Sequence, residues 1–299
     1  MTVEAAACPA PAARRVELLA LSAAGITLLL WASAFVGIRA AGDDFSPGAL
    51  ALGRLLVGAA VLGTIALVRR EPLPRARDLS LIALCGLLWF AAYNVALNAA
   101  ERRVDAGTAA MLVNVGPLLI ALLAGLLLGE GFPKGLFAGC AIAFAGVALI
   151  AVATSDSTSA GGAGTALCLL AALGYAGGVV TQKVVLRRVS PLLTTFLCCV
   201  VAAAALSAAA PSLVGELGDA PAASVGWVLY LGAAPTAIAF TTWAYALART
   251  GAGRLSVTTY LVPALSVLLA WALLGETPPA LAFLGGAVCL AGVGVARRR

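Results

Sequence analysis

Polar side chains lie inside several long apolar runs of this sequence, where they could bind the polar groups of a small molecule. Asn94 and Asn98 are four residues apart, so a helix would place both amides on one face, with Tyr93 beside them. A polar side chain that faces lipid is unfavourable, so such residues turn toward a cavity or a partner helix. We predict that all three line a substrate cavity; hydrogen bonds that only tie helices together would give the same pattern.

Two prolines each follow a polar residue by three positions: Asn114 precedes Pro117, and Tyr260 precedes Pro263. A proline removes one backbone hydrogen bond from a helix and frees a carbonyl group. Broken helices with exposed backbone dipoles bind charged groups of small substrates. We therefore predict helix breaks at both prolines. Asn114 and Tyr260 then either bind substrate or form hydrogen bonds between helices.

Three aromatic residues are predicted to form walls of the same cavity. Trp31 lies in the interior of an apolar run, and Tyr175 follows it by 144 residues. Tryptophan and tyrosine usually mark the membrane interface, but an interior position fits stacking on a substrate better. Trp243 is the third predicted wall residue. Weaker aromatic candidates are Trp89, Tyr230, Tyr245 and Trp271.

Arg54 is a lone cation inside the apolar run 45–68, and no other run has a carboxylate in its interior. It would pair with a substrate carboxylate, with helix-end carbonyls or with an asparagine, or else extend to the membrane surface. Glu130 and Glu276 each follow a glycine at the end of an apolar run. We predict that both cap helices or shape loops, because they occupy equivalent helix ends; the alternative is that they couple transport to protons.

The composition identifies the medium in which these residues act. Of 299 residues, 62% are hydrophobic and 11% charged, against about 45–50% and about 25% in soluble domains. The sequence has no histidine, the commonest general base and metal ligand. Its seven cysteines show no CxxC spacing and are predicted to be small core residues. A soluble enzyme, a disulfide-linked secreted domain and a zinc module are excluded.

Ten segments are long enough to span a bilayer, which takes roughly 20 apolar residues as a helix. The runs show no period-2 alternation, so helices are favoured over barrel strands. We predict an all-α membrane protein with ten transmembrane helices, in the ranges 18–38, 45–68, 79–100, 106–129, 135–155, 157–182, 189–215, 220–248, 255–275 and 277–296.

The connections between these spans differ strongly in positive charge. When they are assigned alternately to two sides, fifteen of the 19 Lys and Arg residues fall on the side of both termini. Positively charged loops stay in the cytoplasm, so we predict cytoplasmic termini in a bacterial inner membrane. The net charge of +6 then reflects topology, and no nucleic-acid partner is expected.

The chain also contains an internal duplication. Residues 100–149 match 246–295 at an offset of 146, and Ser46-Pro47 matches Ser190-Pro191 at an offset of 144. Two copies of a unit with five helices must lie inverted in the membrane, around a central cavity. We predict a tail at 1–15, repeats at 16–153 and 163–299, and a linker at 154–162. Matched pairs include Arg103/Arg249, Gly107/Gly253, Pro117/Pro263, Pro133/Pro279, Phe137/Phe283 and Glu130/Glu276.

The central Trp31 and the doubled block from proline to Leu-Gly-Glu resemble the drug/metabolite transporter superfamily. The chain is most similar to its EamA-type exporters, which include aromatic amino-acid and paraquat exporters. This resemblance implies alternating access through a cavity lined by helices 1, 3, 4, 6, 8 and 9. It also implies that helices 5 and 10 pack the repeats together at the periphery, where small residues are spaced by four at Gly135/Gly139 and Ala287/Ala291.

We therefore predict a secondary transporter that exports small amphipathic metabolites, most simply amino acids. No ATP-binding loop is present, and neither a cofactor nor a metal is expected. A sugar-phosphate or nucleotide-sugar exchanger would need several cations in the cavity, where only Arg54 is available. An intramembrane enzyme would need an activated nucleophile, which we do not find. A membrane scaffold or sensor is the alternative outside transport. The expected partners are a small-molecule substrate and the lipid bilayer, with the protein a monomer or weak dimer.

Overall fold

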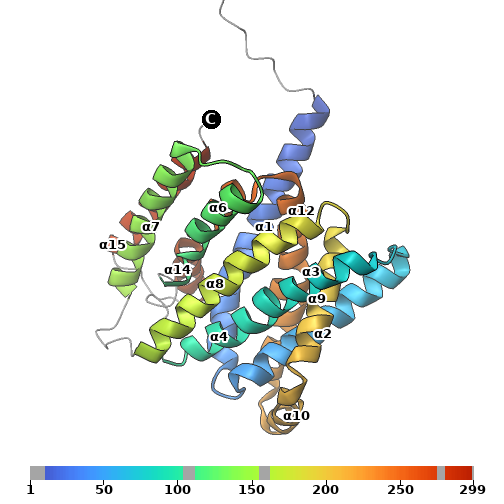
Figure 1. Cartoon of the computed structure of the whole chain (residues 1–299). Coiled ribbons are helices and arrows are strands. Elements are labelled where there is room, and N and C mark those ends of the chain that lie inside the picture. Colours follow the sequence, from blue (N-terminus) through green and yellow to red (C-terminus); the bar gives the residue numbers. More distant parts are fainter. Residues whose placement is uncertain (1–10, 104–111, 155–161, 275–279, 298–299) are drawn as a thin grey trace, which may run out of the picture.

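The computed structural model describes residues 11–103, 112–154, 162–274 and 280–297, and the regular structure in these ranges is helical (Figure 1). The first half contains α1 (Pro11–Ala41), α2 (Pro47–Arg69), α3 (Ala76–Cys85), the π-helix η1 (Gly86–Ala92), α4 (Tyr93–Ala100), α6 (Gly116–Leu127) and α7 (Lys134–Thr154). The second half contains α8 (Gly162–Val185), α9 (Pro191–Ala205), the 3₁₀-helix η2 (Ser207–Ala209), α10 (Ala210–Asp219), α11 (Ala222–Leu231), the π-helix η3 (Gly232–Ile238), α12 (Ala239–Arg249), α13 (Ala252–Ser256), the 3₁₀-helix η4 (Val257–Tyr260), α14 (Leu261–Leu274) and α15 (Ala280–Arg297).

These helices overlap each of the ten predicted spans. Within the described ranges, six helical segments are long and apolar enough to cross a membrane. The pair formed by α9 and η2–α10 is bent by 60° and brings the number of candidate spans to seven. The remaining predicted spans correspond to shorter apolar helices, so the count of ten stays a prediction. These shorter helices are Gly116–Leu127, Lys134–Ile150 and Ala280–Ala296.

Two helices begin with the same backbone geometry at positions 144 residues apart, although only the Ser190 side chain accepts a helix amide. Ser46 before α2 and Ser190 before α9 are both extended, with φ of −63° and ψ of 153° and 151°. Pro47 and Pro191 follow in the first turn, where a proline needs no amide donor and presets φ. The repeated Ser-Pro sequence therefore marks two equivalent helix starts.

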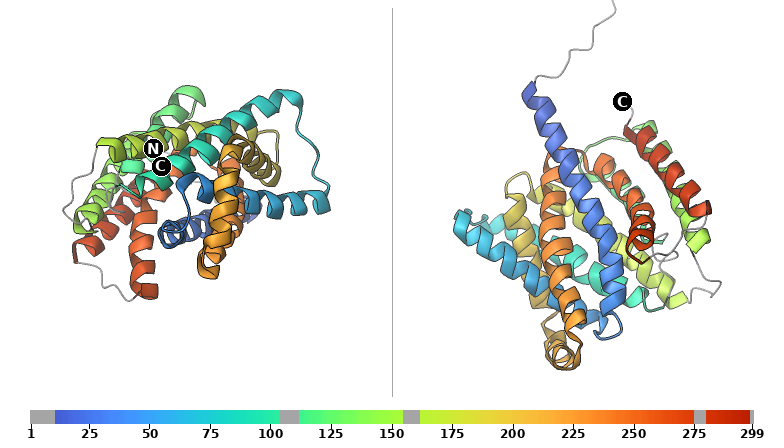
Figure 2. Two further views of the ribbon diagram at one scale, coloured as in Figure 1. Left: turned by 90° about the horizontal axis from the view of Figure 1, so that it is seen from below. Right: turned by 180° about the vertical axis from the view of Figure 1, so that it is seen from behind.

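The helices α7 and α15 lie side by side at one edge of the molecule, where α14, η4 and α6 contact them (Figures 1 and 2). Glycines allow their backbones to touch: a Cβ on Gly139 would lie 2.5 Å from the Cβ of Ala296. A Cβ on Gly292 would likewise collide with the backbone of Ala143. Such close approach through small residues is how helices associate in lipid.

The sequence placed this contact correctly on α7 and wrongly on α15. Gly139 is in the interface as predicted, but Ala287 and Ala291 are exposed. The contacting face of α15 instead carries Gly285 and Cys289, whose thiol donates to the Ala143 carbonyl at 3.4 Å. In an apolar helix rich in alanine and glycine, several faces satisfy the same small-residue spacing.

The start of α1 and the end of α15 lie at the same end of the molecule, here called the terminal end (Figures 1 and 2). The connection 42–46 between α1 and α2 lies at the other end, here called the distal end. Parts of the predicted tail and linker, 1–10 and 155–161, are outside the described residues, and α1 already begins at Pro11. The cysteines at described positions are buried and free, as predicted for core residues: Cys85, Cys140, Cys168, Cys198, Cys199 and Cys289.

Candidate functional site

A cavity of about 80 Å³, here called the central cavity, lies where α1, α2, α4, α8 and α12 meet. Six of the nine predicted binding residues line it: Trp31, Arg54, Tyr93, Asn94, Asn114 and Tyr175. The other lining residues are Ala34, Phe35, Ile38, Trp89, Leu97, Val113, Phe240, Thr259 and Val262.

Three of the nine lining residues outside the predicted set could have been found from the sequence. Phe35 and Ile38 follow Trp31 at helical spacing, so they share its face. Phe240 follows Asn94 by 146 residues, the offset of the internal duplication. Applying that offset to every polar candidate, and not only to those before the prolines, would have found Phe240.

One wall of the central cavity consists of aromatic rings. The ring centroids of Trp31 and Trp89 lie 6.0 Å apart, and the Phe240 centroid lies 5.3 Å and 4.9 Å from them. Tyr175 extends the wall, with its centroid 5.3 Å from that of Trp89. Rings in such contacts offer a large, rigid apolar surface for the apolar part of a ligand.

The position of Trp89 depends on a π-helix and a glycine. Trp89 lies in η1, whose wide turn is packed against α8, and a Cβ on Gly178 would collide with the Cβ of Trp89. The Asn94 amide donates to the Phe90 carbonyl at 2.8 Å and so satisfies part of the irregular backbone. Asn94 therefore holds η1 in place as well as lining the cavity.

A second π-helix occurs at the equivalent position of the second half. η3 begins at Gly232, 146 residues after η1 begins at Gly86, and both contain seven residues. η3 contains Pro235, and the Thr236 hydroxyl donates to the Leu231 carbonyl at 2.8 Å. The duplication thus extends to local backbone geometry near the cavity.

Arg54 is buried next to η3, with 4% of its surface exposed. Its Nε donates to the Thr236 hydroxyl at 3.0 Å, which fixes the guanidinium toward the central cavity. In the described part of the chain, the one ion pair joins Arg188 to Asp78, so Arg54 has no carboxylate partner there. A buried, unpaired guanidinium is a strong site for a carboxylate, which it binds through two parallel hydrogen bonds.

Three predicted binding residues lie away from the central cavity. Trp243 is fully buried behind Trp31, with ring centroids 5.1 Å apart. Asn98 donates to the Pro47 carbonyl at 3.1 Å and lines a second cavity. Tyr260 is fully buried among residues of α6, α7 and α15, whereas its neighbour Thr259 lines the central cavity.

Helical geometry changes just before both predicted break positions. A turn at Asn114 and Val115 precedes α6, which places Pro117 in the first turn of that helix. The 3₁₀-helix η4 precedes α14, which contains Pro263. The Ser256 hydroxyl lies 3.3 Å from the Pro117 carbonyl and donates to it, which links the two irregular regions.

The second cavity, here called the distal cavity, has a volume of about 440 Å³. Ile38 lines both cavities, so the two are neighbours along α1. Four of its ten lining residues are charged: Arg39, Asp43, Glu101 and Arg102. It therefore differs from the mostly apolar central cavity.

At the terminal end, Glu130 joins the two halves of the chain. Its Oε1 accepts the Ala252 amide at 2.7 Å and its Oε2 accepts the Gly253 amide at 3.1 Å. Both amides belong to the start of α13, where helix donors lack partners. The capping role predicted for Glu130 is confirmed, and Glu276 lies outside the described residues.

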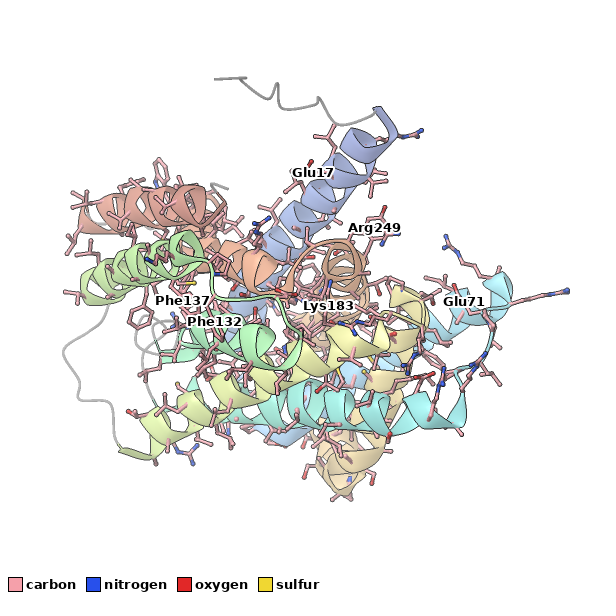
Figure 3. The ribbon with its side chains drawn as sticks, turned by 45° about the horizontal axis from the view of Figure 1, so that its top comes forward. Glu17, Glu71, Phe132, Phe137, Lys183 and Arg249 are labelled. Atoms are coloured by element: carbon pink, nitrogen blue, oxygen red, sulfur yellow. The ribbon has the colours of Figure 1, made fainter. Side chains whose placement is uncertain are left out.

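Lys183 strengthens the same region from α8. Its ammonium group donates to the carbonyls of Leu247 and Thr250, both at 2.6 Å, at the end of α12. Figure 3 shows Lys183 beside this helix end, near Arg249. Phe132, on the connection before α7, stacks on Phe137 in the first turn of α7. We call Glu130, Lys183 and their four backbone partners the terminal clasp.

The sequence matches the EamA-like transporter family twice, over residues 18–152 and 162–298. It is 38% identical to the "Probable terminal-alkyne amino-acid exporter" of Streptantibioticus cattleyicolor, over 92% of each chain. It is 34% identical to the "Uncharacterized transporter YdfC" of Bacillus subtilis, over 88% of this chain and 86% of the other. A solved crystal structure with 21% identity has a TM-score of 0.75 and covers 95% of this chain and 96% of its own.

Proposed function

Because the chain belongs to the EamA-like transporter family and is a multi-pass membrane transporter, we propose that it exports small amphipathic metabolites, most simply amino acids. The relative from Streptantibioticus cattleyicolor, named as a probable amino-acid exporter, supports this substrate class. The site supports it too, since Arg54 fits a substrate carboxylate and the aromatic wall fits an apolar side chain.

We also propose ten transmembrane helices in two inverted repeats, 16–153 and 163–299. Three observations support this architecture: the double family match, the equivalent helix starts at Ser46 and Ser190, and the π-helices 146 residues apart. The positive charge of the connections on the side of the termini supports cytoplasmic termini in a bacterial inner membrane.

The proposed binding site uses three kinds of contact. The Arg54 guanidinium pairs with the substrate carboxylate, and Asn94 and Asn114 offer amides to its polar groups. Trp31 and Tyr175 contact its apolar part. The observation that carries this proposal is the buried Arg54 charge, which faces the cavity without a described carboxylate partner.

The arrangement of the two ends supports alternating access. The terminal clasp and the buried rings close the terminal end, whereas the distal cavity adjoins the central cavity. We propose that this structure is open toward the face opposite the termini. Release of the clasp would then open the cavity to the cytoplasm.

The test is counterflow of radiolabelled L-threonine, L-leucine and L-phenylalanine in proteoliposomes of the purified protein. We expect exchange of at least one of them, and a loss of at least about 100-fold in Arg54→Gln, because a buried carboxylate would lose its charged partner. Arg103→Gln is the matched control, since Arg103 is exposed and donates to the Ala99 carbonyl. Absence of exchange for every amino acid, or full activity in Arg54→Gln, would contradict the proposal; exchange of a sugar phosphate instead would favour the phosphate exchanger.

A further inference from the structure

Glu101 lies at the end of a polar line of residues that connects the two cavities. Asn94, Asn98 and Glu101 follow one another at spacings of four and three, so they share one face of α4 and its end. Asn94 lines the central cavity, whereas Asn98 and Glu101 line the distal cavity. Neither the predicted binding set nor the proposed function uses this carboxyl group.

One oxygen of the Glu101 carboxyl group makes no hydrogen bond to a described residue. This atom, Oε1, is buried. Arg102, next in the chain, directs its guanidinium to the carbonyls of Gly42 and Phe45, at 2.6 and 3.2 Å. Glu101 also follows the last residue of α4, where the helix dipole disfavours a negative charge.

Opposing influences act on the charge of this group. Arg39 of α1 and Arg54 of α2 favour the ionised form, but burial outweighs them and raises the pKa of Glu101 to about 8. Glu101 is therefore mostly protonated at neutral pH and loses its proton as the pH rises through about 8. Among the described residues, the titratable or charged groups around it are Arg39, Asp43, Arg54, Tyr93, Arg102 and Cys168.

We propose that Glu101 is a proton-binding site that couples export to the proton gradient. This proposal rests on the proposed function and adds the source of energy for it. An ionised carboxylate is costly to enclose, so the distal cavity closes only when Glu101 is neutralised. A proton does this in the empty carrier, and the ammonium group of the substrate does it in the loaded carrier. When the ammonium group pairs with Glu101, the carboxyl O–H bond breaks and the proton leaves to cytoplasmic water.

The experiment uses the same proteoliposomes, made of phosphatidylethanolamine and phosphatidylglycerol, with a pH-sensitive dye inside. Wild type is expected to move protons opposite to the radiolabelled amino acid and to accumulate it when a pH gradient is imposed. Glu101→Gln is expected to lose gradient-driven accumulation by at least tenfold. Its substrate–substrate counterflow should continue without pH dependence but with a raised KM, because the ammonium group of the substrate loses its charged partner. Glu101→Asp should keep coupling, and so should Asp43→Asn, which removes a different carboxylate of the same cavity.

Arg39→Gln gives a second readout that does not require loss of the carboxyl group. Removal of one cation near Glu101 is expected to move the midpoint of the counterflow pH profile to higher pH. Proton-coupled accumulation in Glu101→Gln, loss of coupling in Asp43→Asn, or an unmoved midpoint in Arg39→Gln would each overturn the inference. Wild-type counterflow without any proton movement would overturn it and leave amino-acid export standing, whereas no counterflow at all would remove the proposed function itself.

Discussion

The two ends of the central cavity are built from different kinds of contact. Toward the terminal end, Trp89, Phe90 and Trp243 are almost fully buried, and the centroids of Phe90 and Phe240 lie 4.4 Å apart. The terminal clasp then adds four hydrogen bonds to backbone groups. Toward the distal end, the cavity walls carry charged groups with few mutual contacts.

The aromatic rings are fixed by tight packing, whereas the terminal clasp can open and close. The rings are held by shape, and their loss leaves voids that neighbouring residues fill only in part. The clasp is held by hydrogen bonds from two side chains, which can exchange for water when helix ends separate. We infer that the rings define the site, whereas the clasp determines how often the terminal end opens.

The largest change in stability is expected at Gly178, where the backbone of α8 touches Trp89. Gly178→Val would place a branched side chain against Trp89, and we expect a loss of about 3 kcal/mol in stability from overpacking. Gly226→Val is the matched control, because a Cβ there meets nothing within 4 Å. Thermal unfolding in detergent measures both, and equal stability of the two variants would contradict the idea of shape-dependent packing at this end.

A smaller effect is expected from the wall itself. Trp31→Leu keeps an apolar side chain but removes the ring that contacts Trp89 and Phe240, so amino-acid counterflow should fall about tenfold, equivalent to about 1.4 kcal/mol. The matched control is Trp271→Leu, because Trp271 is 45% exposed and lies away from the cavity. If both variants transport alike, Trp31 does not contact the substrate.

The smallest effect is expected at the clasp. Glu130→Gln replaces one of the two carboxylate acceptors by a donor and should shift the closed–open equilibrium by about 1 kcal/mol, or roughly fivefold. A Ser256→Cys variant reports it, since Ser256 is buried behind the clasp and would react faster with a maleimide reagent added from the terminal end. The control is Glu17→Gln, an exposed carboxylate on α1 at the same end (Figure 3); unchanged labelling in Glu130→Gln would mean that the clasp does not limit opening.

Sequence reasoning located helices and several cavity residues because the signals are local. Apolar runs mark the spans, Ser-Pro marks two helix starts, and Trp31 and Tyr175 are conspicuous within their runs. The nine-residue site prediction itself awaits transport measurements, although six of its members share one cavity.

The sequence did not predict which way some side chains face, because this depends on how each helix is oriented about its own axis in the packed structure. Tyr260 matches Asn114 by the duplication offset, but η4 turns Tyr260 into a packed cluster and leaves Thr259 at the cavity. Glu101 directly follows the predicted span 79–100 and was not among the candidate residues, because its burial arises only from the packing of α2 and α8 around α4. The sequence separation between residues therefore determines neither the direction of a side chain nor its burial.

The two π-helices have a mechanical consequence for the residues they carry. Each holds a surplus residue in its wide turn, and moving that residue along the helix rotates the intervening side chains by about 100° without unfolding the span. In η1 such a shift would move the Trp89 indole away from its neighbouring rings. In η3 it would break the hydrogen bond between Arg54 and the Thr236 hydroxyl. A shift of the π-helical turn would therefore reorient a few side chains while both ends of the helix stay in place.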